Sequence, residues 1–442
     1  MTNVFHRTPH NQPPIAVGGK GMYLVDEAGK EYIDASGGAA VSCLGHGDPE
    51  IIKAIQDQAE KLAFAHTGFL SSEPAEELAN ILIEHAPEEF GKVFYVSGGS
   101  EAVESALKLA CQYHLEKGQS QRRHIIARRQ SFHGNTLGVL AVGGNEWRRR
   151  QFEPLLIDVS HIAPCFAYRD QQEGEAEEAY GLRVANELEA EILRLGEDSV
   201  AAFVAETVVG ATAGVVPPVK GYFKRIREIC DQYGVLLILD EVMCGLGRTG
   251  SFFAFEQEDI VPDMITVAKG LGGGYQPIGA LLCTDDIYNV ICEGSGFFQH
   301  SHTYMGHPIA CAAALAVMNA IFERGLLDNV REMGDYLEAK LVEIFGQHPH
   351  IGDLRGRGLF RGIEIVKDRE TKEPFDPALK MNVKIKKAAF ENGMICYPMG
   401  GTIDGENGDH VLLAPPFIAT KNDIDNIVGI LDGAINSVLS KE

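Results

Sequence analysis

Short apolar runs alternate with stretches of helical periodicity along most of the chain. The runs lie at residues 92–96, 124–127, 200–205, 235–239 and 262–268. Short continuous runs rich in valine and isoleucine are typical of strands that are buried on both faces, and their alternation with helices predicts a parallel sheet. We therefore expect an α/β fold whose larger part contains a mostly parallel sheet.

Helical periodicity separates these runs and also dominates the end of the chain. Helices are predicted at residues 49–62, 74–86, 101–118, 219–233, 308–323, 328–346 and 378–392. Short strands are predicted at residues 357–366, 394–397 and 410–413, and a β-hairpin at residues 21–34.

The character of the pattern changes near residue 325, where strand–helix alternation gives way to helices with short strands. This change predicts a smaller α+β domain built from both termini. Residues 1–60 are expected to form its N-terminal part and residues 325–442 its C-terminal part. Residues 61–324 are expected to form the large domain and to hold any ligand site of the sheet.

Residues with reactive side chains stand where predicted strands end. Glu206, Asp240 and Lys269 each end such a strand or follow it directly. Because ligands of open α/β sheets bind outside the carboxyl ends of parallel strands, these side chains are expected to meet in one crevice.

A small-residue turn follows another predicted strand. Ser97-Gly98-Gly99-Ser100 leads directly into a helix. Backbone N–H groups at a helix N-terminus and the Ser100 hydroxyl can bind a phosphate, and Gly99 lets the backbone approach it closely. Ser100 can equally be a plain helix N-cap.

A lysine and a carboxylate that converge on a glycine-lined crevice suggest a pyridoxal-phosphate site. That chemistry needs a lysine, here Lys269, to bond to the cofactor aldehyde, and an acid, here Asp240, to keep the pyridine nitrogen protonated. Phe132 can stack on one face of the cofactor ring while Val242 packs against the other, although both residues can also belong to the core.

A competing interpretation takes Gly245-Leu246-Gly247-Arg248-Thr249-Gly250 as a GxGxxG dinucleotide fingerprint. Asp240 and Glu241 precede these glycines, where they would repel a pyrophosphate. The segment that follows does not have the pattern of an amphipathic helix. A nicotinamide oxidoreductase therefore rests only on this weak motif.

Charge and composition limit the partners. The chain has 442 residues, is 45% hydrophobic and carries a formal net charge of -23. This charge opposes binding to nucleic acid or anionic membranes, and a DNA-binding regulator would need a basic domain that the sequence lacks. The basic run 148–150 is interpreted as a solvated helix face or a local carboxylate contact.

Neither a membrane span nor a disulfide or metal framework is expected. The first residues show no signal-peptide pattern, and no apolar run has the length of a span, so we expect a cytoplasmic protein. Nine cysteines without CxxC pairs predict reduced thiols, and the histidines at 300, 302 and 307 lack a metal-site pattern.

Ten motifs spread over nearly the whole chain resemble the class III aminotransferases, pyridoxal-phosphate enzymes of fold type I. The motifs are GKGMYLVDEAGKEYID, LGHGDP, SGGSEAVE, SFHGNTLG, AETVVG, LLILDEVMCGLGRTG, PDMITVAKGLGGG, HTYMGHP, RGRGLFRGIE and LLAPPF. The resemblance implies an amino-group transfer with pyridoxal 5'-phosphate. It does not exclude aminomutase, epimerase or decarboxylase chemistry on the same fold.

The same resemblance assigns roles residue by residue. It implies Lys269 as the cofactor lysine, Asp240 as the partner of the pyridine nitrogen, Phe132 and Val242 on the two ring faces, and Gly99 and Ser100 on the phosphate. His133 would orient the stacking residue, and Glu206 matches an acid near the cofactor, although Thr207 replaces the usual proline. Thr303 would reach the phosphate of the neighbouring subunit, which implies a homodimer.

Two departures from the family pattern concern the substrate. Leu412 stands where an arginine often binds an α-carboxylate, and Ala211 stands where glutamate-specific members often have an acid. We therefore expect an ω-amino acid or amine as donor and a keto acid, with pyruvate favoured, as acceptor. The arginines at 355, 357 and 361 are candidates for holding the keto acid, and a structural role is the alternative for them.

Overall fold

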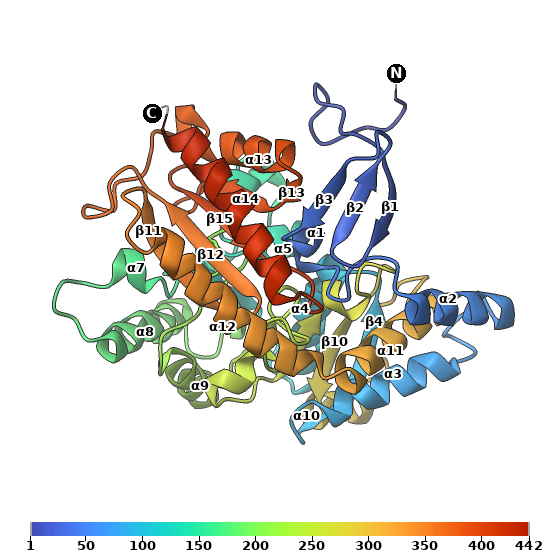
Figure 1. Ribbon diagram of the computed structural model, residues 1–442. Coiled ribbons are helices and arrows are strands. Elements are labelled where there is room, and N and C mark those ends of the chain that lie inside the picture. The colour runs from blue at the N-terminus through green and yellow to red at the C-terminus, as the bar shows by residue number, and fades with distance from the viewer. Residues whose placement is uncertain (1, 441–442) are drawn as a thin grey trace.

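A seven-stranded sheet forms the centre of the protein. The computed structural model describes residues 2–440 (Figure 1). The strand order is β4-β10-β9-β8-β7-β5-β6, and β10 alone runs opposite to the other six. The bounds are β4 (Phe90–Val96), β5 (His124–Arg128), β6 (Ser160–Ile162), β7 (Val200–Glu206), β8 (Leu236–Asp240), β9 (Met264–Val267) and β10 (Gly279–Thr284). The predicted α/β fold with a mostly parallel sheet is confirmed.

Helices cover both faces of this sheet, which explains why its strands are apolar throughout. In β8, Leu236 and Ile238 pack in a cluster with α4 and α5, whereas Leu237 and Leu239 pack in a second cluster with α8 and α9. The helices around the sheet are α3 (Glu73–Glu84), α4 (Gly99–Glu116), α5 (Leu137–Val142), α6 (Glu146–Arg149), α7 (Ala167–Asp170), α8 (Glu177–Leu195), α9 (Tyr222–Tyr233), α10 (Asp285–Glu293) and α11 (Pro308–Glu323).

Two smaller sheets lie beside the central one, and the chain ends meet in them. The first has the order β1-β2-β3-β13, and β13 pairs in parallel with β3 through Met394 and Ile33. The second is antiparallel, with the order β11-β12-β15-β14. Figure 1 shows the blue N-terminal strands and the orange and red C-terminal elements on the same side of the molecule. Segments near both termini thus build the smaller part, as expected, while the proposed boundaries near residues 60 and 325 stay predictions.

The remaining elements lie towards the two ends of the chain. They are β1 (Ala16–Lys20), β2 (Tyr23–Asp26), β3 (Glu31–Asp34), α1 (Gly37–Ala40), α2 (Pro49–Lys61), α12 (Leu326–Phe345), β11 (Ile351–Arg357), β12 (Phe360–Ile365), α13 (Met381–Glu391), β13 (Met394–Ile395), β14 (Tyr397–Gly400), β15 (Asp409–Leu413) and α14 (Lys421–Leu439). No single helix in the described range 2–440 is long and apolar enough to cross a membrane, and one bent pair, α11 with α12 at 67°, passes that test together.

The secondary structure differs from the prediction at several places. The strand expected at 357–366 is β12, which begins only at Phe360 because Gly358 adopts a left-handed turn conformation, and its hairpin partner β11 was not anticipated. The strand expected at 394–397 is two strands that belong to different sheets. Helices α8, α10 and α14 were not anticipated, since their charged faces mask the apolar stripe that each helix buries.

Candidate active site

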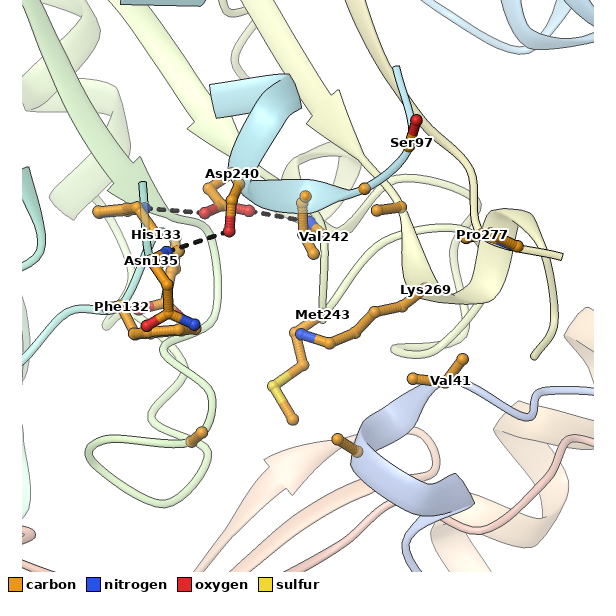
Figure 2. Close-up of a pocket in the computed structure, with 18 of the residues that line it drawn as sticks. Val41, Ser97, Phe132, His133, Asn135, Asp240, Val242, Met243, Lys269 and Pro277 are labelled. Carbon is orange, nitrogen blue, oxygen red and sulfur yellow. Dashed lines mark hydrogen bonds and ion pairs between the residues drawn. The ribbon is translucent and has the colours of Figure 1, made fainter. Parts of the chain in front are cut away.

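A cavity of about 420 Å³ opens at the carboxyl ends of the parallel strands. Eight predicted site residues line it: Gly99, Ser100, Phe132, His133, Glu206, Asp240, Val242 and Lys269. Figure 2 shows Phe132, His133, Asp240 and Val242 near the side chain of Lys269. Thr303 is exposed and does not line the cavity of its own chain, so its role across a subunit interface stays a prediction.

The carboxylate of Asp240 is buried and held by two donors. Nδ1 of His133 lies 2.8 Å from Oδ2, and the backbone N–H of Val242 donates to Oδ1 at 3.0 Å. His133 is itself buried, and its Nε2 has no hydrogen-bond partner in the described residues. The histidine therefore orients the carboxylate towards the cavity, and its own contact is with Asp240 rather than with the ring-stacking residue.

Lys269 follows β9 and extends into the cavity towards Met243 (Figure 2). Burial lowers the pKa of its amine, while the negative charges of Asp240 and Glu206 act in the opposite direction. A lowered pKa makes more of the amine available as a nucleophile and proton acceptor near neutral pH. Its backbone φ of 43° is uncommon for a residue with a side chain, and such strained positions cluster at functional sites.

Glu206 positions the aromatic wall of the cavity. One of its oxygens accepts a hydrogen bond from the backbone N–H of Phe132 at 3.0 Å, and the other accepts from Gly210 at 2.8 Å. Burial raises the pKa of this carboxyl. Thr207, the departure from the family pattern, donates its hydroxyl to buried Glu241, which also accepts N–H groups of the segment after the glycine-rich turn.

The opposite end of the cavity suits an anion. Helix α4 begins at Gly99 without a side-chain cap, so the N–H groups of its first turn point outward unpaired. A Cβ on Gly99 would lie 2.8 Å from Val242, and one on Gly134 would lie 2.4 Å from the Ser100 hydroxyl. The close packing of these glycines leaves a cradle whose donors match a phosphate group.

The profile of the class-III aminotransferases matches residues 5–435. The chain belongs to this family. It is 49% identical to an uncharacterized aminotransferase of Schizosaccharomyces pombe, over 99% of this chain and 95% of the relative. A diaminobutyrate–2-oxoglutarate transaminase of Halomonas elongata is 36% identical over 97% of this chain and 92% of its own length. The structure of an omega transaminase from Pseudomonas jessenii in complex with PMP superposes with a TM-score of 0.92 at 34% identity, over 97% of this chain and 93% of that one.

The cavity of this aminotransferase fits the cofactor of its family. An oriented carboxylate, a lysine with a lowered pKa, an aromatic wall and an uncapped helix N-terminus are the groups that pyridoxal phosphate needs. The dinucleotide alternative is not supported, because the glycines at 245–250 lie in turns that lead to a 3₁₀-helix, Ala254–Glu258, rather than to an α-helix. Residues 2–440 contain no group of three or more potential metal ligands.

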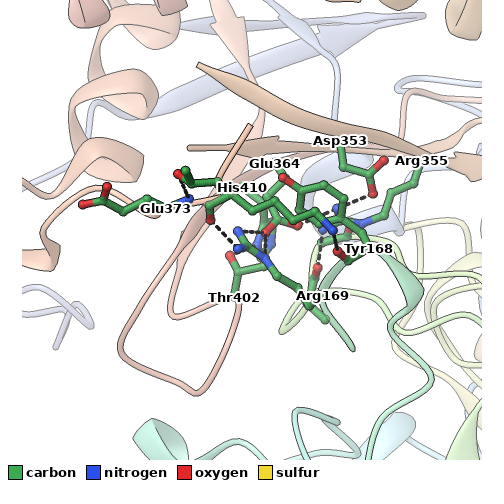
Figure 3. A network of polar contacts seen from close by, with 12 residues as sticks. Tyr168, Arg169, Asp353, Arg355, Glu364, Glu373, Thr402 and His410 are labelled. Carbon is green, nitrogen blue, oxygen red and sulfur yellow. Dashed lines mark hydrogen bonds and ion pairs between the residues drawn. The ribbon is translucent and has the colours of Figure 1, made fainter. Parts of the chain in front are cut away.

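The three candidate arginines of the aminotransferase are structural, which is the second of the two roles that the sequence left open. Arg355 pairs with Asp353 and Glu364 and donates to the carbonyl oxygens of Ala213 and Gly214 (Figure 3). The other two have partners as well: Arg357 pairs with Glu258, and Arg361 with Glu338. None of the three lines the cavity.

The polar network of Figure 3 supports the loop that walls the cavity. His410 on β15 contacts the carbonyl oxygen of Ala211 through Nε2 at 3.1 Å and lies 2.7 Å from the Thr402 hydroxyl through Nδ1. Arg355 holds the same loop two and three residues later. Because Ala211 lines the cavity, the network connects the smaller part of the aminotransferase with its active site.

Sequence reasoning missed Arg148. It lines the cavity and is mostly buried, so the interpretation of the basic run as a solvated face or carboxylate contact was wrong at this position. Only Arg150 is exposed, at 3.5 Å from Glu406. Arg7 and Tyr397 also line the cavity and were not anticipated. An arginine triplet on a short helix gives no sign in the sequence of which member turns inward.

Proposed function

We propose that this aminotransferase uses pyridoxal 5'-phosphate to move an amino group from an ω-amino acid or amine to a keto acid, with pyruvate favoured, in a ping-pong reaction. When bound, the cofactor would supply an aldehyde for the amine and a protonated ring that accepts electrons. Lys269 would hold its aldehyde, Asp240 its ring nitrogen, and the first turn of α4 with Ser100 its phosphate. Phe132 and Val242 would pack against the two faces of its ring.

Lys269 would also move the proton during the reaction. Its amine would be freed when the amino substrate takes its place, and its lowered pKa suits Nζ to act first as general base at the substrate carbon and then as general acid. Asp240 stays oriented by His133 throughout. Glu206 keeps Phe132 in place through the backbone, so the aromatic wall does not depend on the substrate.

The uncharged wall of the cavity beside Lys269 is the feature on which we base the proposed preference for the amino donor. Ala211 and Met243 line the cavity, and Leu412 is fully buried in an apolar cluster with them. An apolar wall binds a methylene chain, at roughly 0.8 kcal/mol per buried CH₂, and is poorly suited to an α-carboxylate next to the reacting carbon. This supports a donor whose amine is remote from its carboxylate or lacks one.

A donor panel tests the proposal. The purified protein is expected to be yellow, and borohydride is expected to fix the cofactor on Lys269. β-Alanine, longer ω-amino acids, alkyl and aryl amines and α-amino acids would each be paired with pyruvate and with 2-oxoglutarate. We expect ω-amino acids or amines with pyruvate to give the highest kcat/KM. A clear preference for glutamate, or no keto acid formed from any donor, would contradict the proposal.

We also propose a homodimer in a reducing compartment such as the cytoplasm. Large apolar side chains are exposed next to Thr303, among them Tyr304 at 62% and Phe64 at 39%, whose ring centroids lie 5.8 Å apart, as on a surface that a second copy covers. All nine cysteines are free thiols, which suits a reducing environment. Light scattering should give twice the chain mass, and a monomer that is fully active would rule the dimer out.

A further inference from the structure

Arg148 brings a positive charge into the active-site cavity without an ion-paired carboxylate, although the charge of Glu206 in the same cavity acts on it. Among the described residues, no carboxylate lies within ion-pair distance of it, and its Nε is buried without a hydrogen-bond partner. A guanidinium has five N–H donors that need acceptors, and one that is removed from water without them is unfavourable. An anion that enters the cavity would satisfy these donors.

The surroundings of Arg148 fix its place in the cavity. Its guanidinium carbon lies 4.4 Å from the ring centroid of Phe132, a distance typical of a cation–π contact. Burial lowers the pKa of Arg148, whereas its interactions with Tyr397 and, to a smaller extent, with Glu206 raise it. The positive charge of Arg7 acts on the same group, so the two cations share one end of the cavity.

This end of the cavity is also where the family's usual cation is missing. Tyr397 on β14 pairs directly with Leu412 on β15, and both belong to the same apolar cluster. Arg148 reaches Tyr397 from α6, an element far from this strand pair in the sequence. Arg148 on α6 therefore provides a positive charge in the cavity, whereas Leu412 on β15 provides none.

The cofactor phosphate does not account for this charge. Its cradle is the first turn of α4 with Ser100, whereas Arg148 contacts Phe132, Trp147 and Tyr397. Arg148 also lowers the pKa of Lys269, so its charge is felt at the reacting amine. The anion that fits is therefore one that the substrate itself carries.

We propose that Arg148 binds the carboxylate of the substrates, both of the ω-amino acid donor and of the keto acid acceptor. The inference rests on the proposed function and narrows its substrate class: ω-amino acids, rather than amines without a carboxylate, are the preferred donors. Both half-reactions would use the same cation: Arg148 would bind the α-carboxylate of pyruvate, next to the reacting carbon, and the carboxylate of β-alanine, one CH₂ further away. Arginine suits this role, since its planar guanidinium binds a carboxylate through two hydrogen bonds.

A purely structural role for Arg148 predicts a different outcome. If it only holds Phe132 through the ring contact, its loss affects every substrate alike. If it binds a carboxylate, its loss affects only ligands that carry one. Matched ligands separate the two roles: propionate against propionamide for binding, and β-alanine against propylamine for amino transfer.

The experiment compares Arg148→Met with Arg150→Met, an exposed neighbour outside the cavity. For Arg148→Met we expect propionate to bind roughly 10- to 100-fold more weakly by calorimetry, and KM for β-alanine to rise by a similar factor, as for the loss of a charge-assisted hydrogen-bonded pair. Propionamide binding and propylamine turnover should change less than about threefold. Arg148→Lys should recover part of the affinity for propionate, and Arg150→Met should match the wild type.

Equal losses for both members of each pair, or unchanged propionate binding in Arg148→Met, would overturn the proposal. So would a wild-type holoenzyme that binds propionate no more tightly than propionamide. Propionate binding needs no turnover. It therefore decides the role of Arg148 even if no amino donor is converted, which would count against the proposed function alone.

Discussion

The carboxylate of Asp240 has its orientation set by His133 and by the N–H of Val242 before any ligand arrives. Such preorganisation is worth most in a buried site, because no water has to be rearranged when charge develops. If Asp240 keeps the pyridine nitrogen of the cofactor protonated, it must carry a negative charge, and a neutral hydrogen-bonding group of the same shape is not sufficient. An isosteric amide separates these two properties.

Asp240→Asn is expected to keep the fold and bind cofactor but to lower kcat/KM by roughly 100-fold or more, the scale on which loss of a positioned electrostatic group is felt. Steady-state kinetics on the cofactor-loaded variant measure this effect, and visible absorbance and circular dichroism serve as controls for loading and folding. Turnover close to that of the wild type would exclude the electron-sink role of Asp240.

At the level of single residues, the sequence located the groups at strand ends and missed those that reach the cavity from other elements. Lys269, Asp240 and Glu206 were predictable because each follows an apolar run. Arg148 lies on the four-residue helix α6, which is too short for any periodicity to show its buried side. For Arg355 the sequence left a structural and a substrate-binding role open, since charge alone does not tell an ion-paired arginine from a free one.

Helix α4 is the element that joins the anion cradle to the ring site. Gly99 opens the helix against Val242, so the space for a phosphate and the space for a ring are set by one contact. A methyl group at this position must displace Val242 or the first turn. Overpacking of this kind typically destabilises by about 1–3 kcal/mol.

Gly99→Ala is expected to lower the stability of the cofactor-free protein by about 1–3 kcal/mol and to weaken cofactor binding. Adding Val242→Ala removes the clash and should restore most of that stability, which a double-mutant cycle with Val242→Ala alone measures by denaturation. Strictly additive effects of the two substitutions would show that the side chain of Val242 is not what limits position 99.

Helices and strands were predictable where the local sequence pattern determines them. They were less predictable where pairing with distant strands determines them. Helix α11 has the predicted bounds, 308–323, because it is apolar all round and begins with a proline. The antiparallel insertion of β10 between β4 and β9 has no local signal, since its residues read like those of the parallel strands. The split of residues 394–400 between two sheets likewise depends on which edges are free.

On the scale of the whole molecule, buried neutral histidines connect stability with pH. Burial lowers the pKa of His410 to about 3 and that of His161 to about 4. The folded protein therefore keeps these rings neutral while the unfolded chain protonates them near pH 6.5. Above pH 6.5 these histidines are neutral in both states and do not reduce the free energy of unfolding. As the pH falls below 6.5 towards the lowered pKa values, protonation favours the unfolded chain and the free energy of unfolding decreases.

Stability is accordingly expected to fall on acidification, by up to about 1.4 kcal/mol per pH unit below pH 6.5 for each such histidine. His410→Asn should lower stability at pH 7, because the carbonyl oxygen of Ala211 loses its partner, and should flatten the decline between pH 6.5 and 4. Thermal unfolding midpoints across this range measure both effects. An unchanged slope would show that His410 does not contribute to the acid sensitivity.

The parallel pairing of β13 with β3 sets the order in which this protein can be completed during translation. Lys30, next to β3, donates to the carbonyl oxygen of Phe390, 360 residues later, and the ring of Tyr32 stacks on that of Phe390 at 4.4 Å. At roughly 5–20 residues per second, the ribosome needs on the order of 20–70 s to supply the missing strand. Throughout that interval β3 has an unpaired edge and an uncovered apolar face, which are the features that chaperones bind on nascent chains.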